Sequence, residues 1–297
     1  MTTPPAAALP RLSVVLPCRD AAATLGTQLA ALAGQAYAGP WEVIVADNGS
    51  RDASRTIAAS FGDRLPGLRI VDAAGRPGQG HARNVGAAAA TGDAFLFCDC
   101  DDEVAPGWLD AMGRALAAHP FVASRFDLAR LNPEWVQASR ENPQGAGLNP
   151  YTYPPFLPHA GGSGLGVRRA AHAAVAGFAE DMPALEDTDY CWRLQLAGVP
   201  LVFVPDAVVH VRLRHDLAGI FRQALVYGEH NVRIYARYRD RGMPRLRWTA
   251  GAARWAKLVI ALPLALPRRA ERARWTWQLG WRLGRLRGCW RYRVLAP

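Results

Sequence analysis

Apolar residues in the first hundred positions fall into short runs that alternate with segments of helical periodicity. Leu25, Leu29 and Leu32 recur at helical spacing, and helices are also expected from about residue 52 and over residues 81–91. The runs of strand length lie at residues 12–16, 41–46, 68–71 and 94–98. Strands that alternate with helices imply right-handed crossovers. The pattern therefore predicts an α/β fold with a mostly parallel central sheet flanked by helices.

The pattern changes over residues 140–166. This segment holds five prolines and the run Gly161-Gly162-Ser163-Gly164, which predicts a long loop, and long loops in compact domains are often functional. Regular structure is expected to resume with helices at residues 168–176 and 187–197 and two strands at residues 201–204 and 208–211.

Composition sets wide limits. A chain of 297 residues, half of them apolar and a fifth charged, buries a core and is not disordered. Its five cysteines are an odd number with no disulfide framework, which favours a reduced, cytoplasmic setting. Residues 1–10 have neither the positive region nor the apolar core of a secretory signal, and we expect them to be disordered.

The net charge of +10 is unevenly distributed. Residues 1–210 hold 15 basic and 21 acidic side chains, a net charge of −6, whereas residues 211–297 hold 20 and 4, a net charge of +16. A strongly basic tail of this kind implies an anionic partner such as phospholipid, nucleic acid or an anionic substrate.

The basic tail follows an apolar segment. Residues 255–267 are apolar except for Lys257, and at 13 residues they are too short to span a bilayer. Residues 268–297 then carry nine arginines and four tryptophans, a mixture suited to lipid headgroups. A basic helix packed on the main domain and a nucleic-acid-binding tail are the alternatives, but no nucleic-acid-binding module accompanies the charge. We expect residues 248–297 to bind an anionic membrane surface, so that the protein is peripheral on the inner face of the cell membrane, with no nucleic acid partner.

Four acids lie within five residues directly after the fourth apolar run: Asp99, Asp101, Asp102 and Glu103. Crowded carboxylates repel one another unless a cation lies among them, and Mg²⁺ and Mn²⁺ prefer oxygen ligands. A solvated acidic turn is the simpler interpretation of an isolated D-x-D. The rest of the chain favours the metal, because ligands bind at the carboxyl ends of parallel strands, where both Asp47 and Asp99 fall.

Several motifs occur in a fixed order, and together they resemble the family 2 glycosyltransferases with the GT-A fold. The resemblance covers roughly residues 11–214 and rests on Ser13–Arg19, Val43–Asp52, Ala82–Gly86, Phe97–Asp102, Gly177-Phe178, Glu186–Asp189, Arg193, Gly198 and His210. It implies a GT-A domain at 11–214, with a donor half at about 11–105 and an acceptor half at about 106–214. Residues 215–297 would then form a basic, Trp/Arg-rich, amphipathic helical extension.

The resemblance implies a nucleotide-sugar donor and assigns residues to it. Pro17 and Arg19 would lie beside the nucleobase and phosphates, and Asp47 would hydrogen-bond the base. A uridine or thymidine donor is favoured and a GDP-sugar is possible. Arg83 would contact the phosphates or ribose. The alternatives are a helix cap after Asp47 and a solvated helical arginine at 83.

The same resemblance implies Mg²⁺ or Mn²⁺ at the acidic run. Asp99 and Asp101 match the D-x-D pair that faces the metal-bound pyrophosphate, and Asp102 would instead orient sugar hydroxyls. His210 matches a histidine that completes the metal site in many relatives. An ordinary histidine at the end of a strand is an equal alternative.

An inverting transferase needs one base to accept the proton of the attacking hydroxyl. Asp187 matches that base, and Glu186 beside it would raise the pKa of one of the two acids. The alternative is that these acids stabilise the first turn of the following helix, and an aspartate can do this and also act as the base. Arg193 would be a salt-bridge partner or a phosphate contact. The Gln-x-x-Arg-Trp motif of processive synthases does not follow, so we expect addition of one sugar to a glycan or lipid-linked acceptor.

Three other interpretations are weaker. A nucleotidyltransferase would carry a glycine-rich basic loop after the first strand, where this chain has Pro17-Cys18-Arg19-Asp20. A non-catalytic GT-A-like binding module would not need Asp187. A nicotinamide-dependent dehydrogenase would show G-x-G-x-x-G after a strand, and the chain does not.

Overall fold

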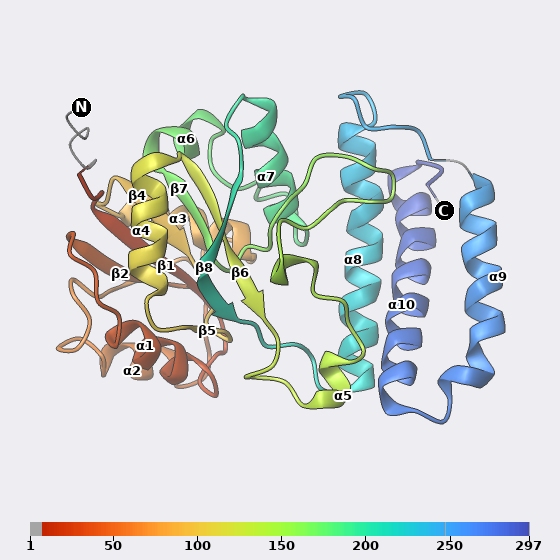
Figure 1. The fold of residues 1–297 in the computed structure, drawn as a ribbon, viewed down its shortest axis with the longest axis horizontal. Helices are drawn as coiled ribbons and strands as arrows, with labels where there is room; N and C mark the ends of the chain where they lie inside the picture. The colour runs from red at the N-terminus through yellow and green to blue at the C-terminus, as the bar shows by residue number, and fades with distance from the viewer. Residues whose placement is uncertain (1–7, 247, 297) are drawn as a thin grey trace, which may run out of the picture.

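A computed structural model describes residues 8–246 and 248–296 of the chain, and Figure 1 shows its arrangement. Within these residues one sheet runs through the centre of the molecule. Its strands are β1 (Leu12–Cys18), β2 (Trp41–Asp47), β3 (Arg69–Asp72), β4 (Ala94–Phe97), β5 (Glu103–Val104), β6 (Phe121–Asp127), β7 (Leu165–Arg168) and β8 (Val202–His210). Of the segment expected to be disordered, residues 1–7 lie outside the described residues, and residues 8–10 lead directly into β1.

Helices cover both faces of the sheet and one end of it (Figure 1). They are α1 (Leu25–Ala33), α2 (Ser54–Ala59), α3 (Gln79–Ala89), α4 (Trp108–Ala118), α5 (Glu134–Gln137), α6 (Arg169–Ala174), α7 (Glu186–Leu196), α8 (Leu217–Tyr238), α9 (Trp248–Ala265) and α10 (Arg269–Tyr292), with a 3₁₀ turn at Pro143–Gly145.

The strand order is β3-β2-β1-β4-β7-β6-β8-β5. Four of the seven pairings are parallel, which confirms the mostly parallel sheet, and β7 runs antiparallel to both of its neighbours. In the parallel half the register places Cys18 beside Asp47 and Asp47 beside Asp72. The carboxyl ends of β1, β2 and β3 therefore lie at one edge of the sheet.

Alternation along the buried strands divides the core into two layers. Leu12, Val14 and Leu16 of β1 pack in the layer that contains α1, α2 and α4. Val15 points to the opposite layer, which contains α3, α6, α7 and part of α8. Both faces of the sheet are covered, as expected for strands that read as continuous apolar runs.

The second half of the chain differs from the expected pattern in two respects. The two strands expected at 201–204 and 208–211 are one strand, β8, whose pairing with β6 shifts register between Ser124 and Arg125. The expected loop at 140–166 is irregular but packed, because the buried amide of Gln144 donates to the carbonyl of Ser124 and accepts from the N–H of Gly161. The loop also ends early, at the start of β7.

Helices α8 and α10 lie against each other along most of their length (Figure 1). Gly280, Gly284 and Gly288 of α10 recur every fourth residue, and a Cβ at any of them would contact the backbone of α8. Two arginines of α10, at 287 and 291, pair with the buried Glu229 of α8. The basic segment after residue 268 is therefore packed onto the molecule. No helix within the described ranges is both long and apolar enough to cross a bilayer.

A buried carboxylate joins the first three strands. Glu42 of β2 accepts hydrogen bonds from the Ser13 hydroxyl of β1 at 2.7 Å, from Thr91 at 2.6 Å and from the Arg69 guanidinium of β3 at 2.6 Å. Burial alone would raise the pKa of Glu42, but these hydrogen bonds lower it from 4.5 to about 2. Glu42 therefore stabilises the fold in its ionised form.

We expect Glu42→Gln to lower the free energy of unfolding by about 2–3 kcal/mol near neutral pH, since the carboxylate bonds weaken and the amide brings an unneeded donor. A group with a lowered pKa in the folded state stabilises above its unfolded pKa, so the difference from wild type should narrow as the pH falls from about 5 toward 2. Urea unfolding across this range measures it. Glu134→Gln, at an exposed position of α5, is the control. A difference that does not vary with pH contradicts the assignment.

Candidate active site

The carboxyl ends of β1, β2 and β4 border a cavity of about 470 Å³. Pro17 and Arg19 come from the end of β1, and Asn48 directly follows β2. The other polar residues that line it include Asp20, Gln79, Asp99, Asp101, Arg212 and Arg214. Four of the predicted site residues thus line one space: Pro17, Arg19, Asp99 and Asp101. Arg212 and Arg214, which follow β8, are additions that the sequence did not indicate.

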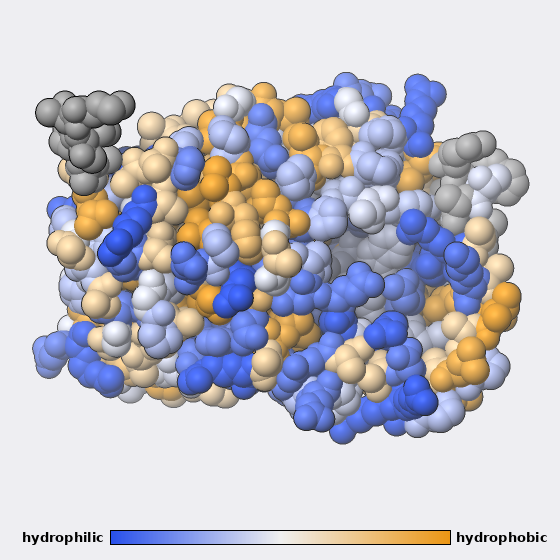
Figure 2. Space-filling model, in the orientation of Figure 1, coloured by the Kyte–Doolittle hydropathy of each residue, from blue (hydrophilic) through white to orange (hydrophobic). Residues whose placement is uncertain are grey.

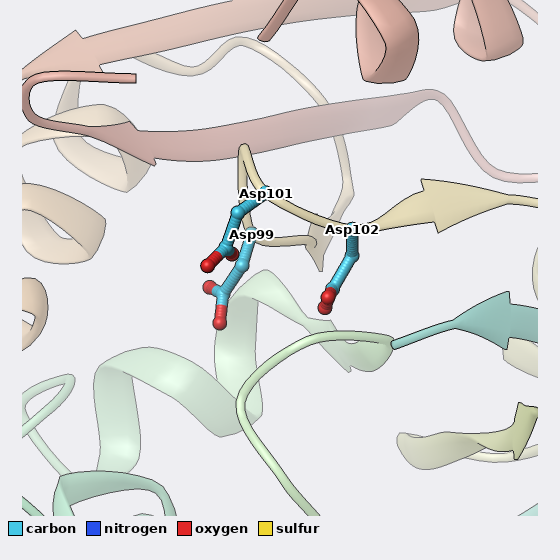
Figure 3. A group of neighbouring side chains, drawn as sticks. All are labelled: Asp99, Asp101 and Asp102. Carbon is cyan, nitrogen blue, oxygen red and sulfur yellow. The ribbon is translucent and has the colours of Figure 1, made fainter. Parts of the chain in front are cut away.

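The chain turns sharply after β4 and brings three carboxylates together. One oxygen from each of Asp99, Asp101 and Asp102 lies within 4.8 Å of the others. Figure 3 shows the carboxylates of Asp99 and Asp101 next to each other, with that of Asp102 directed to the same side. Three oxygen donors at this spacing fit a hard divalent cation.

Burial and mutual repulsion act on these aspartates. Burial raises the pKa of Asp101, and the negative charge of Asp99 raises it further. The pKa of Asp102 is raised well above its ordinary value by burial and by its two acidic neighbours, although the backbone N–H of Arg212 donates to it at 2.9 Å. The three acids thus carry an excess of negative charge that a cation would relieve.

Arg83 of α3 lies buried behind this group. Its guanidinium contacts Asp99 at 2.8 Å and Glu186 of α7 at 2.7 Å, and its guanidinium carbon lies 5.3 Å from the ring centre of Phe178. Arg83 does not line the cavity, so its contacts differ from the expected approach to donor phosphates or ribose. A Cβ at residue 162 would lie 2.7 Å from the guanidinium carbon, which explains the glycine there.

Asp187, in the first turn of α7, lines a second cavity of about 750 Å³. Its carboxylate accepts from the backbone N–H groups of Gly162 at 2.9 Å and Thr188 at 2.7 Å, which fix its direction. Glu186 is buried beside it and bonded to Arg83. Burial raises the pKa of Glu186 to about 7, helped by the charge of Asp187 and opposed by Arg83.

Asp47 is nearly buried at the end of β2. It accepts from the N–H of Ser50 at 3.1 Å and from the guanidinium of Arg55 at 2.8 Å. Burial acts to raise its pKa, but these bonds lower it overall, so Asp47 is ionised. The backbone turn after β2 thus occupies one oxygen of Asp47, and Arg55 of α2 occupies the other.

His210 lies apart from the three aspartates. Its Nδ1 is 2.6 Å from the carboxylate of Asp127 at the end of β6, and in the sheet it pairs with Glu103. Among the described residues the group that could hold a metal contains Asp99, Asp101 and Asp102 without His210. Arg193, the other residue with two expected roles, forms a salt bridge with Asp189 at 2.7 Å.

The second cavity also has walls that the sequence did not indicate. Arg140 follows α5, Tyr227 belongs to α8, and Trp277 belongs to α10. Residues this far apart in the chain give no local pattern. The alternation of Arg and Trp in α10 was the available signal, and it was interpreted as a lipid-binding surface.

A parallel half-sheet whose strands end at an acidic group beside a nucleotide-sized cavity is the arrangement of GT-A glycosyltransferases. Comparison with protein families agrees: the chain belongs to glycosyl transferase family 2, whose model matches residues 13–175. The chain therefore has an α/β GT-A fold with a helical C-terminal region.

Individual proteins resemble it over most of its length. The pre-mycofactocin glycosyltransferase of Mycobacterium tuberculosis is 28% identical over 275 residues, which cover 88% of this chain and 54% of that protein. The chain thus spans about half the length of this curated relative. The mannosyltransferase PcManGT from Pyrobaculum calidifontis, solved with GDP-Man and Mn²⁺, is 20% identical with a TM-score of 0.69. The match covers 97% of this chain and 90% of that one. Glucosyl-3-phosphoglycerate synthase from M. tuberculosis, solved with Mn²⁺ and UDP, is 20% identical with a TM-score of 0.53. That match covers 80% of this chain and 81% of the other. These structures bear on the fold alone.

Proposed function

We propose that this protein transfers one sugar from a nucleoside-diphosphate donor to an acceptor hydroxyl with inversion, and that Asp187 is the general base. One observation supports this most directly: the two cavities adjoin at Asp99 and Asp101, which line both of them. A donor in the first cavity would present its sugar at the boundary, and an acceptor in the second would approach from the side of Asp187. Inversion requires the acceptor hydroxyl to attack the anomeric carbon from the side opposite the leaving diphosphate.

Asp187 is suited to the proton transfer. Two backbone N–H groups orient its carboxylate, which opens into the second cavity. It would accept the hydroxyl proton as the oxygen bonds to the anomeric carbon and the bond to the diphosphate breaks. Glu186 lies behind it, bonded to Arg83 and away from the cavity lining, so we assign Glu186 to holding the first turn of α7 in place.

The acidic group is suited to Mg²⁺ or Mn²⁺ held by Asp99 and Asp101, with Asp102 adjacent. The metal would neutralise negative charge on the leaving diphosphate. Arg212 and Arg214, which line both cavities, would bind phosphate oxygens from the other side. Solved structures of the same fold hold Mn²⁺ with GDP-Man or with UDP, which supports a nucleotide-sugar and leaves the base open. The expectation of a uridine or thymidine donor rests on the resemblance at Asp47, which lines neither cavity.

Asp101→Asn should weaken Mn²⁺ binding at least about tenfold, because it removes a charged ligand from a small acidic group. Nucleotide-sugar binding should lose its dependence on Mn²⁺ in parallel. Titration calorimetry with Mn²⁺ alone, and then thermal shifts with UDP-, dTDP- and GDP-sugars, measure both effects.

Asp127→Asn is the matched control for this experiment, since Asp127 pairs with His210 outside the acidic group. If Asp127→Asn weakens Mn²⁺ binding as much as Asp101→Asn does, His210 and its partner belong to the metal site after all. Unchanged Mn²⁺ binding by Asp101→Asn contradicts the assignment.

Asp187→Asn should lower the rate of sugar transfer by about 10²–10⁴-fold while changing donor affinity less than about twofold, because the base acts only in the reaction step. Release of nucleoside diphosphate, followed with the donor that gives the largest thermal shift, measures the rate. Asp206→Asn, an exposed acid on β8, is the control. Equal losses of donor binding and rate would show that Asp187 serves binding instead.

We also propose that α9 attaches the protein to an anionic membrane surface. Val259, Ile260, Leu264 and Leu266 are more than half exposed on or just after this helix. Figure 2 shows apolar side chains along the outer edge of the molecule where α9 lies, bordered by hydrophilic ones. The groove between α9 and α10, about 740 Å³, carries the cations Arg254, Lys257, Arg268, Arg274 and Arg282. Apolar and basic side chains in this combination suit an interface helix.

Leu264→Glu should reduce binding to phosphatidylglycerol vesicles at least about tenfold. It removes a leucine that would be buried in the membrane interface and adds a negative charge that the anionic lipids repel. Co-sedimentation at low and moderate salt measures it. Leu196→Glu, at an exposed leucine of α7 in the main domain, is the matched control. Equal vesicle binding by wild type and Leu264→Glu contradicts attachment through α9.

A further inference from the structure

The C-terminal helices close the cavity that contains Asp187. Arg222, Val226 and Tyr227 of α8 and Trp277 of α10 line it opposite the residues of the main domain. Removing these helices would leave one wall of the cavity open. They are therefore part of the site as well as a candidate membrane attachment.

Arg140 stands out within this cavity. Its guanidinium carbon lies 3.4 Å from the ring centre of Trp277, so the planar group rests on the indole face. Tyr227 contacts the same indole edge-on, with ring centres 5.8 Å apart at 75°. A guanidinium stacked in this way keeps its N–H groups pointing outward in its own plane.

The guanidinium of Arg140 has no acidic partner in the part of the chain that the structure describes. The buried Arg83 is paired with Asp99 and Glu186, whereas no ion pair of the described residues involves Arg140. Burial lowers the pKa of Arg140 to about 10, and only Tyr227 opposes this effect. A cation held in place without a counter-charge at the wall of a cavity is a site for an anion.

The cavity carries charges of both signs. Burial raises the pKa of the Tyr227 phenol, and the negative charges of Asp187, Glu186 and Asp99 raise it further. The lining thus combines the acid Asp187 with the cations Arg140 and Arg222. A ligand that has both a hydroxyl and an anionic group matches this combination.

We propose that the acceptor carries a phosphate or carboxylate group and that Arg140, stacked on Trp277, binds it and so orients the acceptor hydroxyl toward Asp187. The identification of the ligand as an acceptor rests on the proposed transfer reaction. The anion site at Arg140 does not depend on that reaction. Arg140 is a specificity-determining residue in this scheme and takes no part in proton transfer.

Titration calorimetry on the full chain without added metal tests the anion site. The probes are phenyl phosphate, benzoate and the neutral phenyl β-glucoside. Wild type should bind one or both anions more tightly than the glucoside, and comparing the two identifies phosphate or carboxylate. Arg140→Gln should weaken anion binding at least about tenfold, the change expected when a charge-assisted hydrogen bond is lost.

Two further variants make the result specific. Arg140→Lys should show an intermediate loss, because lysine keeps the charge but not the planar fork. Arg114→Gln, at an exposed arginine on α4 paired with Asp110, should bind as wild type does. Thermal melting confirms that each variant is folded.

Wild-type anion affinity in Arg140→Gln would overturn the proposal, as would equal binding of the glucoside and the anions by the wild type. Donor binding with Mn²⁺ is measured separately. Failure of donor binding would reject the transfer reaction, and loss of Arg140-dependent anion binding would reject only this inference.

Discussion

The buried guanidinium of Arg83 connects two parts of the fold that are far apart in the chain. It contacts Asp99 after β4 and Glu186 at the start of α7, residues 87 positions apart in the chain, from a place where water cannot reach it. A buried cation is tolerated only when carboxylates compensate it, and removing one partner of such a pair costs about 3–5 kcal/mol. The acidic group and α7 therefore have a fixed relative position. The glycine at 162 belongs to the same constraint, since any side chain there would displace the guanidinium.

The first half of the fold was predictable from the sequence because its information is local. Each of β1, β2 and β4 is an apolar run of its own, and the residues at or just after their carboxyl ends, 17–19, 47 and 99–102, must meet at one edge of a parallel sheet. The second half was less predictable. β7 lies inside a segment rich in glycine and proline, and β8 contains a proline and an aspartate that made one strand resemble two. Arg83 was recognised as important, but nothing local indicates which carboxylates a buried arginine will contact.

The C-terminal region illustrates how composition can mislead. Nineteen arginines after residue 210 suggested a segment that binds an anionic membrane surface, with a basic helix packed on the main domain as an alternative. The structure shows that glycines at 280, 284 and 288 determine how α10 packs, because they allow its backbone to approach α8 closely, while Arg285 is buried and bonded to Asn231. The charge and the packing signal occupy different faces of the same helix. Only the arrangement of the helices shows that Trp277 faces a cavity and that α9 keeps its apolar side exposed.

Residues 128–160 leave the sheet after β6 and return to it at β7, and these two strands are direct antiparallel neighbours. The ends of this excursion are fixed by the sheet, and the N–H of Gly164 is bonded to the carbonyl of Phe97 at the end of β4. Arg140 lies within the excursion, whereas the aspartates and Asp187 lie outside it. The excursion is also joined to α7, because the carbonyl of Leu157 accepts from the indole N–H of Trp192 and the carbonyl of Pro158 accepts from the side-chain amide of Gln195. A change within residues 128–160 would therefore alter the cavity wall at Arg140 and the support of the helix that carries Asp187 at the same time.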